Sequence, residues 1–171
     1  MKRYKWLLGI IWVCTGMQVS AQERTWGNFQ INVPDTWSMT QTKGSILLSN
    51  YNLKEAEPFS ITLFDASAIE GKSDSAFLLA WNNYVSPLTG TPEIPRPRRL
   101  FTDEGVPVFQ GFKEVKDLTN PHYYQLNVYV VNNVLQACLL QTTTLKNFRL
   151  VQAEWQDRLL GIKMIEAYKR K

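Results

Sequence analysis

The sequence predicts an α+β domain in which a mainly antiparallel sheet of about six to eight strands is sandwiched between two helices. Three observations support this prediction. Short segments that alternate apolar and polar residues recur along the chain, two segments (74–86 and 145–160) carry apolar residues at helical spacing, and residues 122–144 have the pattern of a long β-hairpin. Strands followed by a helix, then strands again and a second helix, are typical of a sheet whose faces are covered by helices.

The hairpin at residues 122–144 indicates where the core lies. Asn132 and Asn133 suit a two-residue type I′ turn, because asparagine tolerates the positive φ that both turn positions need. The turn sets the register and gives one aliphatic face and one mixed face. The aliphatic face pairs Val130 with Leu135, Val128 with Ala137 and Leu126 with Leu139, and the mixed face pairs Tyr129 with Gln136, Asn127 with Cys138 and Gln125 with Leu140. Since the second face is not polar, we expect it to be partly covered too.

The first half of the chain predicts strands and then a helix. Strands are expected at 28–33, at 37–42 and 45–50 joined by a turn at Lys43 and Gly44, and at 59–64. A helix is expected over 74–86, with a cap at Ser73 and Asp74, an end at Pro87, and an apolar stripe of Leu78, Trp81, Val85 and Leu88. Residues 87–99 contain four prolines and predict an extended crossing over the surface.

The second half predicts more strands and a second helix. Strands are expected at 98–102 and 106–115, the latter with a bulge at Gly111, and a turn at 117–121 leads into the hairpin. Thr144 is expected to cap a helix over 145–160 with an apolar stripe of Phe148, Val151, Trp155 and Leu159, which ends before Gly161. The tail is expected to pack briefly through Ile162, Met164 and Ile165.

The first residues predict export. Lys2, Arg3 and Lys5 precede an apolar run from Trp6 to Met17, and small residues up to Ala21 form a cleavage site. The run is shorter than the about 20 residues of a membrane span, so a permanent membrane anchor is the poorer interpretation. We predict a signal peptide over residues 1–21 and a single exported domain over residues 22–171, periplasmic or extracellular after cleavage near Ala21.

Charge and cysteine content exclude some functions. Removing residues 1–21 leaves 16 basic and 15 acidic residues, a net charge of +1, which gives no basis for nucleic-acid binding. Cys138 is the one cysteine outside the leader, so an intramolecular disulfide is impossible. Its place in a strand favours a buried thiol over a reactive one.

The sequence contains no pattern that specifies a catalytic or metal site. His122 and Cys138 project to opposite faces of the hairpin, so they form no nucleophile pair. With one histidine in the chain and no carboxylate set spaced for a metal, we predict neither metal nor cofactor. A small carboxylate-based hydrolase is the alternative, and it would need two acids to converge in a cleft. The acid pairs are Glu55 and Glu57, Asp103 and Glu104, Glu114 and Asp117, and Glu154 and Asp157.

Arg96, Arg98 and Arg99 are the candidate partner-binding residues, together with Trp26. One interpretation of the arginines is a solvated strand entry that pairs with nearby acids. The other is a contact with an anion or a partner protein of the envelope or extracellular space, because arginine is enriched in interface hot spots. Trp26 either covers an edge strand or stands exposed at an interface.

Several motifs resemble one superfamily. They are the segments FQINVPDTW and FSITLF, the helix with Phe77 and Trp81, and the closing hairpin with its amphipathic helix. These resemble the superfamily of PsbP, the Ran-binding nuclear import factors and the bacterial DcrB-like periplasmic proteins, over roughly Asn28 to Leu160. Thr36 stands where members often have glycine, so a different turn is expected before Trp37. The resemblance implies an αβα sandwich that binds partner proteins and is not an enzyme. We therefore expect a non-catalytic interaction or accessory domain.

Overall fold

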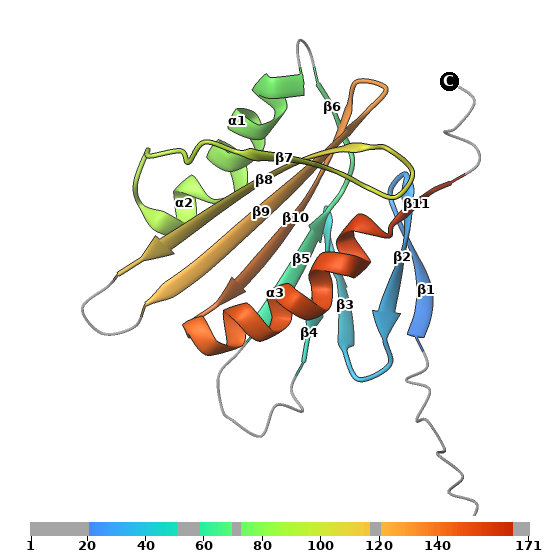
Figure 1. The fold of residues 1–171 in the computed structure, drawn as a ribbon, viewed down its shortest axis with the longest axis horizontal. Helices are drawn as coiled ribbons and strands as arrows, with labels where there is room; N and C mark the ends of the chain where they lie inside the picture. The colour runs from blue at the N-terminus through green and yellow to red at the C-terminus, as the bar shows by residue number, and fades with distance from the viewer. Residues whose placement is uncertain (1–20, 51–58, 70–72, 117–120, 166–171) are drawn as a thin grey trace, which may run out of the picture.

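The computed structural model describes residues 21–50, 59–69, 73–116 and 121–165, which form two sheets and three helices (Figure 1). The main sheet has eight antiparallel strands in the order β3-β4-β5-β10-β9-β8-β7, with β6 paired to β10 beside this path. Its strands are β3 (Ser38–Thr42), β4 (Ser45–Ser49), β5 (Phe59–Phe64), β6 (Ser67–Ala68), β7 (Arg98–Phe101), β8 (Pro107–Val115), β9 (His122–Val131) and β10 (Val134–Thr142). The α+β class and the antiparallel sheet are confirmed.

The hairpin of β9 and β10 lies at the centre of the main sheet and has the predicted register. Val130 is opposite Leu135 and Asn127 is opposite Cys138. Both turn residues have positive φ, 50° at Asn132 and 59° at Asn133, as a type I′ turn requires. The local sequence therefore fixed the pairing on which the rest of the sheet is built.

Each face of the main sheet has its own core, as predicted. The aliphatic face of the hairpin packs against α1 (Ser73–Tyr84). The mixed face packs against α3 (Leu145–Leu160) and a three-stranded sheet of β1 (Ala21–Trp26), β2 (Phe29–Pro34) and β11 (Lys163–Met164). Figure 1 shows α3 crossing in front of the main sheet, with α1 on the far side. The main sheet thus lies between the two longer helices.

Helix α3 begins and ends where the sequence predicts. The Thr144 side chain accepts a hydrogen bond from Asn147 N at 3.3 Å, which satisfies one of the free donors of the first turn. Gly161 N donates to Asp157 O at 2.7 Å at the other end. The predicted stripe of Phe148, Val151, Trp155 and Leu159 is buried.

The predicted apolar stripe of the first helix is wrong at two positions. Leu78 is 47% exposed and Leu88 is 51% exposed, whereas Trp81 and Val85 are buried. The buried face includes Phe77 and Trp81, which are one helical turn apart and lie on the sheet side. Pro87 does not end a helix but lies in the first turn of a short second helix, α2 (Ser86–Thr89). Proline is tolerated there, because N–H groups of the first turn make no hydrogen bond within the helix.

The predicted bulge at Gly111 is absent. Gly111 is opposite Leu126 and Phe112 is opposite Gln125, so the pairing of β8 with β9 runs on without an extra residue. Glycine is needed here for space, because a Cβ atom at this position would lie 2.4 Å from Phe77 Cζ. The glycine lets the α1 side chains approach the sheet.

The remaining differences concern short elements and chain ends. Strands β1, β6 and β11, and with them the second sheet, were not predicted, although the expected packing of Ile162 is confirmed by its burial. Before Trp37, whose N donates to Pro34 O at 3.0 Å, the turn needs no positive φ at Thr36. The side chains of Ser73 and Asp74 and residues 117–120 of the predicted turn lie outside the described residues. In the described ranges, no helix has the length and apolarity of a membrane span.

Candidate functional site at the edge strand β7

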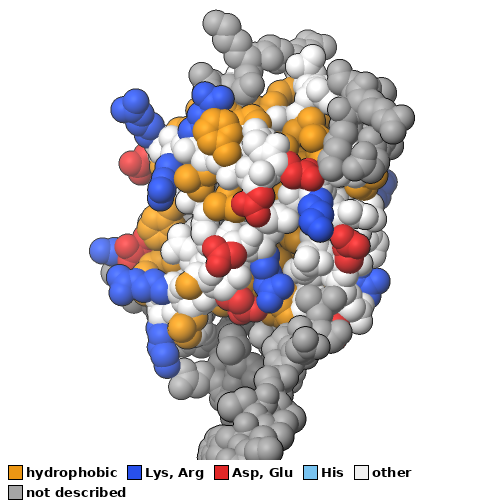
Figure 2. All heavy atoms as spheres, turned by 45° about the vertical axis from the view of Figure 1, so that its right-hand side comes forward, with side chains coloured by type: hydrophobic (Ala, Val, Ile, Leu, Met, Phe, Trp, Pro, Cys, Tyr) orange, Lys and Arg blue, Asp and Glu red, His pale blue; other side chains and the backbone are white. Residues whose placement is uncertain are grey.

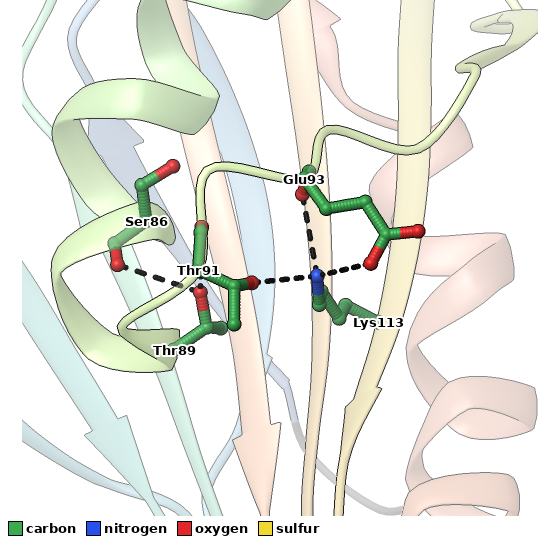
Figure 3. Close-up of polar contacts among 5 residues, drawn as sticks. All are labelled: Ser86, Thr89, Thr91, Glu93 and Lys113. Carbon is green, nitrogen blue, oxygen red and sulfur yellow. Dashed lines mark hydrogen bonds and ion pairs between the residues drawn. The ribbon is translucent and has the colours of Figure 1, made fainter.

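The loop that leads into β7 is fastened to the main sheet by Lys113 (Figure 3). Lys113 Nζ, on β8, donates to Thr91 Oγ1 at 2.7 Å and to Glu93 O at 3.3 Å, and it pairs with Glu93 Oε2 at 3.0 Å. The Lys113 side chain is 12% exposed while that of Glu93 is 83% exposed, so the lysine reaches the loop from beneath. These contacts set the path of residues 91–97 and hence the position of the arginines that follow.

The structure separates the three arginines of the predicted cluster. On β7, Arg98 is opposite Gln110 and Arg99 is opposite Phe109, so the two side chains project to opposite faces of the sheet. The Arg99 guanidinium lies over the rings of Phe101 and Phe109, 5.2 Å and 5.9 Å from their centroids, on the α1 side. Arg98 lies on the α3 side, where it lines a groove with Gln110. Arg96 precedes both in the loop.

All three arginines are exposed, and none makes a hydrogen bond or an ion pair within the described residues. Within the described residues the three arginines therefore do not form the predicted pairs with nearby acids. Their strand, β7, is one of the two edge strands in the order given above, and Phe101 beside them is 54% exposed. We call Arg96, Arg98, Arg99 and Phe101 the β7 surface.

Trp26 does not belong to any exposed surface. It is 1% exposed, its Nε1 donates to Phe64 O at 2.8 Å, and its ring meets Tyr129 edge-on with centroids 5.5 Å apart. The prediction of an exposed contact at an interface is corrected: the β1–β2 hairpin carries the indole into the core between the two sheets.

The acidic side chains of the predicted pairs are exposed wherever they are described, and Glu55, Glu57 and Asp117 lie outside the described residues. Two acids, Glu93 and Glu114, line one hollow of 280 Å³ with Lys113. Glu93 is paired with Lys113, and Glu114 accepts a hydrogen bond from Tyr123 Oη at 3.2 Å. Both carboxylates are open to solvent. No group of three potential metal ligands occurs in the described ranges.

Cys138 and His122 lie on opposite sides of the main sheet, as predicted. Cys138 is fully buried among the residues that face α3, and this burial raises the pKa of its thiol. His122 stacks near Tyr124, which belongs to the core on the α1 side. The thiol is therefore part of the core. The imidazole cannot activate it, because the two side chains lie on opposite faces of the main sheet.

Sequence reasoning missed a set of amide side chains between α3 and the sheet. We call Gln110, Gln125, Asn127, Gln152 and Gln156 the amide floor. A signal was present: Gln152 and Gln156 are one helical turn apart, and Gln125 and Asn127 share a strand face. Two amide pairs at matching periodicities indicate a polar contact between a helix and a strand.

Comparison with known proteins gives the fold of this chain. No protein-family model and no curated protein matches the sequence. Among solved structures, a cyanobacterial PsbP (CyanoP) from Synechocystis matches with a TM-score of 0.59 and 13% identity, over 92% of this chain and 100% of that one. The Ran-binding protein Mog1p of Saccharomyces cerevisiae matches with a TM-score of 0.54 and 14% identity, over 87% and 97%.

A third solved structure, a protein from Bacteroides thetaiotaomicron, matches with a TM-score of 0.54 and 11% identity over 81% of this chain. This chain spans 46% of the length of that protein. Together the three matches confirm the predicted resemblance: the chain has the fold shared by PsbP and Mog1. At such identities the likeness concerns the fold, while function depends on the residues of the site.

Proposed function

We propose that this chain is a non-catalytic protein-binding domain whose partner contacts the β7 surface. The observation that carries the proposal is a set of three exposed arginines, free of acidic partners in the described residues, on the outer strand of the sheet. Arginines without internal partners can make bidentate hydrogen bonds to carboxylates of another protein. The fastening of the loop by Lys113 lowers the entropy cost of presenting them.

The fold comparison is in keeping with this role, since one of the similar structures is a Ran-binding protein. The carboxylate-based hydrolase gains no support from the described acids, which are solvated rather than gathered in a cleft. The partner would be a protein of the envelope or the extracellular space, given the predicted export.

The experiment is an affinity capture from the envelope fraction with the wild-type domain and with Arg96, Arg98 and Arg99 all changed to Ala. We expect capture of the partner to fall sharply, while the melting temperature hardly moves because exposed charges contribute only about 0 to 1 kcal/mol each. Lys43→Ala, an exposed cation in the turn between β3 and β4, is the matched control and should capture like the wild type. Undiminished capture by the triple variant at moderate salt would refute the proposed surface.

Single variants then show which side of β7 the partner covers. Arg98→Ala should weaken capture if the partner lies on the α3 side, and Arg99→Ala if it lies on the α1 side, because the two side chains project to opposite faces.

We further propose that residues 1–21 are a signal peptide, removed after Ala21, and that the domain acts in the periplasm or outside the cell. Strand β1 begins at Ala21, opposite Pro34, so a mature chain that starts at Gln22 retains the pairing from Gln22 with Val33 onward. Intact-mass measurement of the exported protein should give the mass of residues 22–171. A product that still contains the leader would contradict this proposal.

A further inference from the structure

A groove runs between the outer strand β7 and helix α3, on the side of the sheet that Arg98 faces. It has a volume of 440 Å³. Its lining comes from three elements: Arg98 and Leu100 of β7, Gln110 of β8, and Arg149, Gln152, Ala153, Gln156 and Leu160 of α3. The groove exists because α3 packs its apolar stripe on the centre of the sheet and leaves the outer strand uncovered.

The charge of the groove is wholly positive. Among the residues that the structure describes, Arg98 and Arg149 are its charged lining residues, and no aspartate or glutamate lines it. Neither guanidinium makes a hydrogen bond or an ion pair within the described residues. Both side chains are exposed and free to bind a carboxylate from another molecule. Figure 2 shows charges of both signs spread over one face of the molecule.

The amide floor lies beneath this groove and is linked by hydrogen bonds. Gln110 Nε2 donates to Asn127 Oδ1 at 2.9 Å and to Gln156 Oε1 at 3.2 Å. Gln152 Nε2 donates to Gln125 Oε1 at 2.7 Å. Asn127 is 2% exposed, and its Nδ2 has no hydrogen-bond partner among the described residues. Gln125 and Asn127 are buried while Gln110, Gln152 and Gln156 are half-buried, so the layer reaches from the core to the groove.

The floor also leaves groups that suit a peptide backbone. Within the described residues, no hydrogen bond is made by Gln156 Nε2, a donor, or by Gln110 Oε1, an acceptor. A main-chain amide presents one acceptor and one donor. The two glutamines can therefore bind the C=O and N–H of a chain that lies in the groove.

The dimensions favour an extended chain over a small anion. The lining of α3 runs from Arg149 to Leu160, a length of about 16 Å at about 1.5 Å per residue. Gln110, which is opposite Arg98 in the sheet, donates a hydrogen bond to Gln156 of α3. Gln156 is about 10 Å from Arg149 along the helix axis, so Arg98 is displaced from Arg149 by a similar length in that direction. Two carboxylates on the same side of an extended strand lie about 7 Å apart, which matches this spacing once the reach of the two arginine side chains is included.

We propose that the β7–α3 groove binds an extended acidic segment of the partner protein. Its carboxylates pair with Arg98 and Arg149, and its backbone bonds to Gln110 and Gln156. This inference rests on the proposed protein-binding function and extends it, because Arg149 lies on α3 and outside the loop and strand on which that function was argued.

The probe is a short fluorescein-labelled peptide that alternates Glu with Ser, which places its acids on one side of an extended chain. Fluorescence anisotropy should show binding that weakens as salt rises, and a peptide with Gln in place of Glu should bind little. Arg149→Glu and Arg98→Glu should each weaken binding by about tenfold or more, since each loses a charge-assisted pair and gains a repulsion. Lys43→Glu is the control with the same charge change and should bind within about twofold of the wild type.

A second measurement follows the side-chain amide resonances of Gln110 and Gln156 in a nitrogen–proton correlation spectrum, which should shift on addition of the peptide in wild type. Equal binding by Arg149→Glu and wild type, or resonances that do not move, would overturn the groove. Displacement of the peptide by inorganic phosphate or by oligothymidine as readily as by unlabelled peptide would overturn the assignment to an acidic protein segment.

The same variants separate this inference from the proposed function. If the triple alanine variant loses partner capture while Arg149→Glu retains it, the β7 surface stands and the groove does not. If the triple variant retains capture, the proposed function itself fails.

Discussion

Gly111 allows α1 to pack closely against the sheet because it has no side chain. Its backbone lies under the rings of Phe77 and Trp81, and a Cβ atom would lie 2.4 Å from Phe77 Cζ and 3.0 Å from Trp81 Cζ3. Both rings are fully buried, so they have no free space into which they can move. The residue is a spacer and not a bulge.

Changing Gly111 to Ala should therefore destabilise the domain by about 1 to 3 kcal/mol through overpacking. Urea denaturation measures this difference. Combining it with Phe77→Leu, which removes the opposing ring atoms, should cost less than the sum of the two single changes, because the pair is in direct contact. Additive costs would show that the strain lies elsewhere, for example in the backbone of β8.

At the scale of elements, the proline-rich loop depends on a contact with a neighbouring strand. Lys113 of β8 holds Thr91 and Glu93, and only one of its partners is a charged group. Ile94 of the loop packs against the core on the α1 side, and the Lys113 contact is a second point that defines the loop's path into β7.

Changing Lys113 to Met should lower stability by only about 1 kcal/mol, since Glu93 is exposed and the methionine can still cover the sheet. The amide hydrogens of residues 91–96 that are not prolines should exchange faster with solvent, and capture of the partner should weaken with the arginines intact. Hydrogen exchange followed by mass spectrometry makes the measurement. Lys116→Met is the control, because Lys116 is an exposed lysine three residues further along the chain. Unchanged exchange in the loop would show that the prolines alone fix its path.

Helix α3 combines two kinds of contact on adjoining stripes. Val151, Trp155 and Leu159 bury apolar surface against the core. Gln152 and Gln156 form hydrogen bonds with Gln125 and Gln110, the amide-floor residues of the sheet. The apolar stripe anchors the helix by the hydrophobic effect, and the amides then fix how it lies against β8 and β9. The groove beside β7 is a consequence of that placement.

At the scale of the whole molecule, a buried glutamine helps to join the two sheets. Gln136 of β10 receives a hydrogen bond from Asn28 N at 2.8 Å on Oε1 and donates from Nε2 to Trp26 O at 2.9 Å. Gly27 between them has φ of 53° and lies too close to this side chain for a Cβ atom. The turn of the β1–β2 hairpin is thus held against the main sheet, which explains how Trp26 comes to be buried.

The candidate site could be predicted only in part. Arg96, Arg98 and Arg99 were recognised because they are adjacent in sequence, and strand periodicity then divides Arg98 from Arg99 once β7 is placed. Arg149 was not recognised, since it is far from the other arginines along the chain and meets Arg98 only across the groove. The likeness to PsbP and Mog1 identifies the fold and leaves the site to these residues.

The sequence by itself determined the elements whose cause is local. The hairpin register follows from two asparagines that accept positive φ, and the start of α3 follows from a capping threonine. The helix ends at the predicted place, but Gly161 has a φ of −84° there and does not use a glycine's conformational freedom. Tertiary structure alone decided the buried face of α1, the role of Gly111, the burial of Trp26 and the addition of β1 and β11 as a second sheet. The physical reason is that turn and cap energies depend on neighbours in the chain, whereas burial and shape depend on which distant segments come to lie against one another.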